Sequence, residues 1–189
     1  MNWLAHLFLS EPTPEFQIGG LLPDVAPAAS LAGLADGFQR GIRRHREIDA
    51  FTDTHPVFLR SKARFSPPLR RFGGILVDVI YDHFLARDWH RYSQQSLGSF
   101  ADSFYAELVA RRSDIPLVAF TRLEPMKADN WLCSYADVEG VATALRRISM
   151  RLSRPFDMSP AANVLSANYA AFEEDFGQFF PEVRALVGR

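Results

Sequence analysis

A histidine and two aspartates recur at every fourth position in one stretch of the chain: His45, Asp49 and Asp53. In an α-helix, residues with this spacing lie along one face. Phe38 and Ile42 precede them on a helical spacing, so this face is expected to be buried. Buried imidazole and carboxylate groups need partners, and both are common ligands of divalent metal ions.

A second cluster lies in FGGILVDVIYDHFLA, residues 72–86, which is apolar on nearly every side of a helical wheel except at Asp78, Asp82 and His83. Burying two stacked carboxylates is costly because each loses water and they repel one another. A divalent ion would offset this cost, and so would a buried arginine. Histidine and several aspartates suit Mn²⁺, Fe²⁺, Zn²⁺ or Mg²⁺. We therefore predict one metal centre shared by the two helices.

Each of these groups also has an ordinary structural explanation, because single histidines and aspartates in a core are often hydrogen-bonded residues or helix caps. Their coincidence on two helices favours a site. Asp53 could instead close the end of its helix. His6 lies in an apolar N-terminal helix and Asp24 in a Gly-Pro loop, so each is a weak candidate by itself, and Arg46 could serve a carboxylate or a substrate phosphate.

Apolar residues are spaced mostly by three and four, which predicts an all-α chain, arranged as a single-domain helical bundle over residues 1–189. Residues 18–27 are expected to form a loop. The expected helices, bounded mainly by prolines, are 2–10, 26–36, 38–53, 56–65, 69–89, 97–112, 115–123, 136–151, 160–176 and 178–187.

Composition indicates a globular protein that needs no disulfides, since hydrophobic residues make up 48% of the 189 and there is one cysteine, Cys133. No apolar run is long enough to span a bilayer, and the first residues lack the basic start of a secretion signal. We therefore expect a cytoplasmic protein that does not associate with membranes.

Positive charge is concentrated in residues 40–71, where nine Lys and Arg face three acidic residues in a chain of net charge −1. Such a segment indicates an anionic partner, although a solvated helical face would have the same composition. Nucleic acid is not expected, because basic and aromatic residues do not alternate and no DNA-binding motif is present.

Five motifs, in order along the chain, together resemble the acyl carrier protein phosphodiesterases. They are MNWLAHL at the start, GGLLPD at 19–24, G-I-x-x-H-R-x-I-D-x-F-T-D-x-H-P at 41–56, D-x-x-x-D-H-F-L-x-x-x-W at 78–89 and NWLCSY at 130–135. That family is similar in its helical fold to the HD-type phosphohydrolases, with a variant metal motif.

The resemblance implies hydrolysis of the phosphodiester that joins 4′-phosphopantetheine to a serine of holo-acyl carrier protein, with Mn²⁺ or another divalent ion such as Mg²⁺ or Fe²⁺. On this hypothesis, Asp49 or Asp78 would orient the attacking water or act as general base, and Arg46 and His6 would stabilise the developing charge. The metal ligands would be Asp24, His45, Asp82 and His83.

Acyl carrier proteins are acidic, so the basic segment is expected to dock the substrate through Arg60, Lys62, Arg64, Arg70 and Arg71. Two other functions remain open. One is an HD-type phosphohydrolase that acts on a nucleotide or another small phosphoester. The other is a non-catalytic binder of acidic proteins, in which the His/Asp cluster is structural.

Overall fold

The computed structural model describes residues 1–152 and 154–188, and every regular element within them is helical, which confirms the all-α prediction. In this described part, no helix has the length and hydropathy that a membrane span requires. The α-helices are α1 (Trp3–Phe8), α2 (Pro14–Gly19), α3 (Leu22–Val25), α4 (Asp36–Thr54), α5 (Pro56–Lys62), α6 (Gly73–Arg87), α7 (Leu97–Ala110), α8 (Leu117–Leu123), α9 (Pro125–Ala128), α10 (Trp131–Ser134), α11 (Val138–Ser149), α12 (Ala161–Ala167) and α13 (Tyr169–Leu186). Short 3₁₀ turns, η1 (Ala28–Ser30), η2 (Leu69–Phe72) and η3 (Trp89–Arg91), connect some of them.

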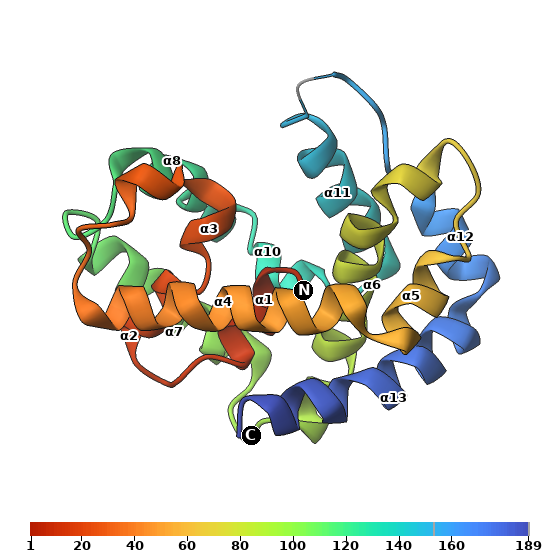
Figure 1. Cartoon of the computed structure of the whole chain (residues 1–189), viewed down its shortest axis with the longest axis horizontal. Coiled ribbons are helices and arrows are strands. Elements are labelled where there is room, and N and C mark those ends of the chain that lie inside the picture. The colour runs from red at the N-terminus through yellow and green to blue at the C-terminus, as the bar shows by residue number, and fades with distance from the viewer. Residues whose placement is uncertain (153, 189) are drawn as a thin grey trace.

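The helix α6 forms the centre of the molecule and contacts α1, α5, α11 and α13. Its residues are buried on almost all sides, as the apolar helical wheel predicts. The long helix α4 runs along the longest axis, with α1 near its middle (Figure 1). The N-terminus therefore lies at the centre of the fold, between the two helices that carry the clusters found in the sequence.

The close crossing of α2 and α4 depends on two glycines. A Cβ atom on Gly41 would overlap the Phe16 carbonyl oxygen and lie 2.8 Å from the Gly20 nitrogen. A Cβ atom on Gly19 would overlap the Phe38 carbonyl oxygen. Only glycine lets the two backbones approach this closely, and the crossing holds the Gly20 carbonyl beside α4.

Two expectations for the N-terminal third are wrong. The helix expected at 26–36 is absent: η1 occupies Ala28–Ser30, much of the rest is exposed turn, and Asp36 already belongs to α4. The segment 18–27, expected to be a loop, holds the end of α2 and all of α3. Helices of four to six residues are too short to show a periodic pattern, and tertiary packing decides whether they form.

The C-terminal helices divide at a different residue from the one expected. The break falls at Asn168, between α12 and α13, and α13 continues through Pro181. The residues around this proline are buried: Phe179 and Phe180 before it and Val183 after it. Their packing maintains the helix although proline removes one backbone hydrogen bond.

Candidate functional site

Two buried imidazole rings lie together at the candidate site. His6 of α1 and His45 of α4 stack with ring centroids 4.0 Å apart. Asp49, one turn further along α4, faces both rings: its Oδ1 lies 3.2 Å from His6 Nε2, and its Oδ2 lies 2.9 Å from His45 Nε2. His45 and Asp49 therefore lie on one face of α4, as their spacing predicts, and α1 contributes a second histidine beside them.

The orientation of His45 follows from the α2–α4 crossing. His45 is one helical turn beyond Gly41, and its Nδ1 lies 2.8 Å from the Gly20 carbonyl oxygen. A carbonyl can only accept, so Nδ1 carries the proton. In neutral His45 the lone pair on Nε2 then points at the Asp49 carboxylate, and this arrangement requires a proton or a metal ion between them.

Asp24, on α3, also lies close to His45 Nε2. Its Oδ1 is 3.6 Å from His45 Nε2, and its Oδ2 accepts a hydrogen bond of 2.9 Å from Trp3 Nε1. The loop residue that was only a weak candidate in the sequence therefore lies at the site. Three separate segments supply the carboxylates and imidazoles.

Asp78 of α6 completes one side of the site, which we call the acidic wall and which also contains Asp24, Asp49 and Asp53. The Met1 α-amino group lies 3.0 Å from Asp78 Oδ1 and 3.1 Å from Asp49 Oδ1. Burial disfavours the charge on this amine, but the two carboxylates outweigh that effect and raise its pKa to about 10. Burial also raises the pKa of Asp78. The wall therefore stabilises a positive charge at the point where Asp49 and Asp78 converge.

The donor set fits a divalent metal. One ligand atom from each of His6, His45 and Asp49 can be chosen so that all lie within 4.8 Å of one another. Burial lowers the pKa of His6 to about 4, so its imidazole is neutral at pH 7, as a metal ligand must be. Nδ1 of His6 has no hydrogen-bond partner among the described residues, whereas Nε2 lies 3.2 Å from Asp49 Oδ1.

Two predicted metal ligands lie elsewhere, and the first is Asp82. Its Oδ2 accepts a hydrogen bond of 2.8 Å from the Leu4 backbone N–H, and its Oδ1 accepts one of 2.9 Å from that of Ala5. These are donors of the first turn of α1, which no residue of α1 can satisfy. Asp82 therefore caps α1 from a neighbouring helix, and both of its oxygens are used.

His83 is the second predicted metal ligand that lies outside the candidate site. Its Nδ1 lies 2.8 Å from the Tyr135 carbonyl oxygen and its Nε2 lies 2.8 Å from the Tyr169 hydroxyl. The carbonyl must accept from Nδ1, so the hydroxyl donates to Nε2. Burial lowers the pKa of His83, in keeping with a neutral ring. No lone pair remains for a metal, and His83 instead joins α6 to the end of α10 and to α13.

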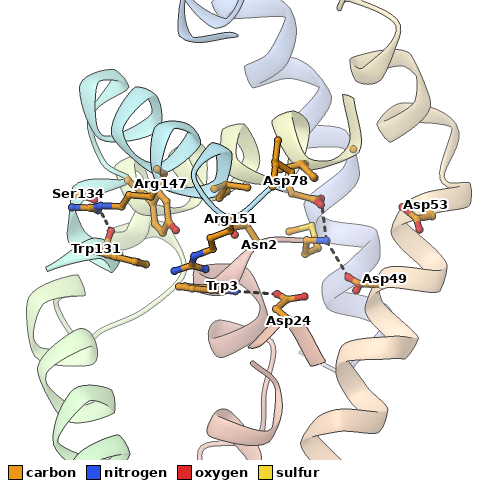
Figure 2. A pocket seen from close by; sticks show the side chains of 17 residues that line it. Asn2, Trp3, Asp24, Asp49, Asp53, Asp78, Trp131, Ser134, Arg147 and Arg151 are labelled. Atoms are coloured by element: carbon orange, nitrogen blue, oxygen red, sulfur yellow. Dashed lines mark hydrogen bonds and ion pairs between the residues drawn. The ribbon is translucent and has the colours of Figure 1, made fainter. Parts of the chain in front are cut away.

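A pocket of about 490 Å³ opens onto the acidic wall and lies within the range typical of small-molecule sites. Figure 2 shows Asp24, Asp49, Asp53 and Asp78 on one side. Trp131, Arg147 and Arg151 stand on the other. Trp131 belongs to the NWLCSY motif at 130–135, whereas the two arginines lie in no motif, and their spacing of four residues is also typical of a solvated helix.

Arg46 does not line this pocket and is exposed on α4. Some of the positive charges of the basic segment form ion pairs within the protein. Arg60 and Arg64 both form ion pairs with Asp175, which is 1% exposed. Removing either arginine would weaken the compensation of a buried carboxylate.

Carboxylates on one wall, one of them in contact with two buried imidazoles, and arginines opposite define a pocket of the kind that binds and hydrolyses phosphoesters. The family model described as acyl carrier protein phosphodiesterase matches residues 1–183. The chain therefore belongs to the acyl carrier protein phosphodiesterase family.

Bacterial proteins named acyl carrier protein phosphodiesterase are similar to this chain over nearly its full length. That of Pectobacterium atrosepticum is 30% identical over 189 residues, which cover 99% of this chain and 97% of the relative. That of Photorhabdus laumondii is 31% identical, with 96% and 92% covered. No solved structure matches the chain, so the resemblance to HD-type phosphohydrolases stays a prediction.

Proposed function

We propose that this chain is a single phosphodiesterase domain that hydrolyses the bond between 4′-phosphopantetheine and the serine of holo-acyl carrier protein. The products are apo-acyl carrier protein and 4′-phosphopantetheine. The observation that carries the proposal is a pocket lined by Asp49, which contacts the buried His6 and His45, in a chain of this family. The names of the relatives favour a carrier-protein substrate over a nucleotide or a purely structural cluster.

The metal-holding residues in this proposal are His6, His45 and Asp49, with Asp24 adjacent. We assign Asp82 and His83 to structural positions because their polar atoms are occupied. When bound, a divalent ion such as Mn²⁺ supplies Lewis acidity toward a phosphoryl oxygen and the attacking water.

Asp78 is the proposed general base. It lines the pocket, and burial raises its pKa, which makes the carboxylate a better proton acceptor near neutral pH. The attacking water loses its proton to this carboxylate and forms the new P–O bond. The bond from phosphorus to the serine oxygen breaks, and that oxygen takes the proton held by Asp78 and leaves as the serine hydroxyl. Arg46, which lies outside the pocket, is assigned to carrier-protein docking.

Docking would use the exposed part of the basic segment. Arg70 and Arg71 lie in η2, a few residues before Gly74 and Ile75, which line the pocket. Arg60 and Arg64 contribute less, because Asp175 already neutralises part of their charge. An acidic carrier protein bound beside η2 would bring its prosthetic group to the pocket mouth.

Intact-mass spectrometry of holo-acyl carrier protein tests the reaction directly. With the enzyme and Mn²⁺, the carrier protein is expected to lose the mass of its phosphopantetheine group, and EDTA is expected to prevent the loss. Asp49→Asn should lower the rate at least 100-fold, because it removes a charged oxygen from the proposed ligand set. Asp36→Asn, on the same helix with a side chain 78% exposed, is the matched control.

An unchanged carrier-protein mass with folded, Mn²⁺-loaded enzyme would contradict the proposal. Turnover of small phosphoesters under the same conditions would then favour the HD-type alternative.

A further inference from the structure

Arg151 stands opposite the acidic wall without a carboxylate partner. It follows the end of α11, is exposed at the pocket mouth and forms no ion pair with any described residue. Arg147, one turn earlier, lies on the same side but pairs with Asp129 at 2.8 Å. Two arginines four residues apart repel each other, and only one of them is neutralised.

Two stacked tryptophans hold Arg151 in place. The rings of Trp3 and Trp131 are 5.7 Å apart and nearly parallel. The Arg151 guanidinium lies 5.2 Å from the Trp3 ring centroid and 5.6 Å from that of Trp131. Both tryptophans are buried, so they form a fixed platform. Trp3 also donates to Asp24, which ties the platform to the metal-holding residues.

The pocket thus has one wall that attracts cations and one that attracts anions, as Figure 2 shows for Asp24 and Arg151. A phosphodiester has two non-bridging oxygens and can face both walls at once. A planar guanidinium fixed on an aromatic platform suits bidentate binding of such oxygens. Beside it, Ile75, Ala144 and Ile148 line an apolar part of the pocket that could hold an alkyl chain.

We propose that Arg151, held on the Trp3–Trp131 platform, binds the phosphate of the substrate and of the released 4′-phosphopantetheine. This inference rests on the proposed function for the identity of the phosphate. It deepens that function by assigning the phosphate contact to a residue just after α11, outside all five motifs.

Isothermal titration of the Mn²⁺-loaded protein with 4′-phosphopantetheine and with pantetheine, which lacks the phosphate, tests the proposal. The wild type is expected to bind the phosphorylated compound more tightly. Arg151→Gln should weaken that binding about 10- to 100-fold, the usual effect of losing a hydrogen-bonded charge, and leave pantetheine binding unchanged. Arg151→Lys keeps the charge but lacks the planar guanidinium, so its affinity for 4′-phosphopantetheine should lie between those of the wild type and Arg151→Gln.

The matched control is Arg146→Gln, an exposed arginine of α11 that does not line the pocket. It should bind 4′-phosphopantetheine as the wild type does. Equal binding by Arg151→Gln and the wild type would overturn the inference, and so would a wild type that does not distinguish the two compounds.

The mass assay separates the two proposals. Release of phosphopantetheine from holo-acyl carrier protein, together with unaltered binding by Arg151→Gln, would refute the role of Arg151 alone. Phosphate binding that depends on Arg151, without any release, would refute the proposed reaction and leave the phosphate site standing.

Discussion

His6 and His45 stack against each other but differ in their charge. His45 is held by the Gly20 carbonyl and faces two carboxylates. Burial opposes its charge, but Asp49 and Asp24 with the Gly20 carbonyl together outweigh that effect, and the pKa of His45 is raised. The pKa of His6 is lowered to about 4, chiefly by burial, with a contribution from His45. One ring therefore favours the charged form, and the other stays neutral.

This difference predicts an acid-sensitive contribution to stability. Unfolded His6 takes up a proton below pH 6.5, whereas folded His6 does so only near pH 4, so the unfolded state gains stability as pH falls between these values. In metal-free protein, the free energy of unfolding at pH 5 should lose about 2 kcal/mol from this residue relative to pH 7. Urea denaturation of the wild type and His6→Gln in EDTA measures the difference. Parallel pH profiles for the two proteins would show that His6 titrates normally in the fold.

At the scale of elements, the helix α1 depends on Asp82. Six residues form too short a helix to be stable alone. Asp82 supplies acceptors for two donors of its first turn and lies at 0% exposure on α6. Since α1 carries both Trp3 and His6, a residue outside the pocket determines where two site residues lie.

Asp82→Asn should therefore destabilise the protein by about 1–3 kcal/mol, because the amide nitrogen cannot accept and one buried N–H loses its partner. Thermal unfolding measures this, with exposed Asp102→Asn on α7 as control. Equal melting temperatures for the two variants would contradict the capping role.

The α2–α4 crossing gives a second prediction for an element. Gly41→Ala places a methyl group against the Phe16 carbonyl, so the helices must separate and the Gly20 oxygen must move from His45. We expect a loss of at least about 1 kcal/mol, as for other overpacked contacts, and weaker Mn²⁺ binding. Calorimetric unfolding and Mn²⁺ titration report the two effects.

Gly177→Ala is the control for that substitution. It lies inside α13 with nothing within 4 Å of the added Cβ atom, so alanine should stabilise the helix by about 0.5–1 kcal/mol. Similar destabilisation by both substitutions would show that the close α2–α4 crossing is not the cause of the loss at Gly41.

At the scale of the whole molecule, the basic segment is divided between folding and the proposed docking. Arg60 and Arg64 neutralise buried Asp175, and Ser61 donates to the same carboxylate. A substitution at either arginine would therefore change stability together with binding. Arg70 and Arg71 are exposed and are the residues with which docking can be tested.

The double variant Arg70→Gln, Arg71→Gln should raise KM for holo-acyl carrier protein severalfold at low salt, with kcat nearly unchanged. The difference from wild type should shrink as ionic strength rises, because salt screens exposed charges. Steady-state kinetics at two salt concentrations measure this. Arg112→Gln, exposed beyond the end of α7, is the control. An unchanged KM at low salt would argue against docking at η2.

Much of the fold was predictable because long helices carry their pattern in the sequence. The stripe of α4 and the all-round apolar character of α6 indicate their lengths and buried faces. The short helices α2, α3 and α10 were missed, since four to six residues cannot show periodicity. Of the predicted site, His45, Asp49 and Asp78 lie together with His6 and Asp24, whereas Asp82 and His83 lie apart.

The sequence by itself determined the chemistry: the stripe of His45 and Asp49, the buried aspartates of α6 and the family to which the motifs belong. The tertiary structure alone decided which groups meet. Helical spacing fixes the rotation of a side chain about its own axis but does not specify the neighbouring element. Asp78 and Asp82 share a face of α6, yet one meets the Met1 amine and the other the first turn of α1. Arg151 reaches the pocket for the same reason, because packing places the end of α11 over Trp3.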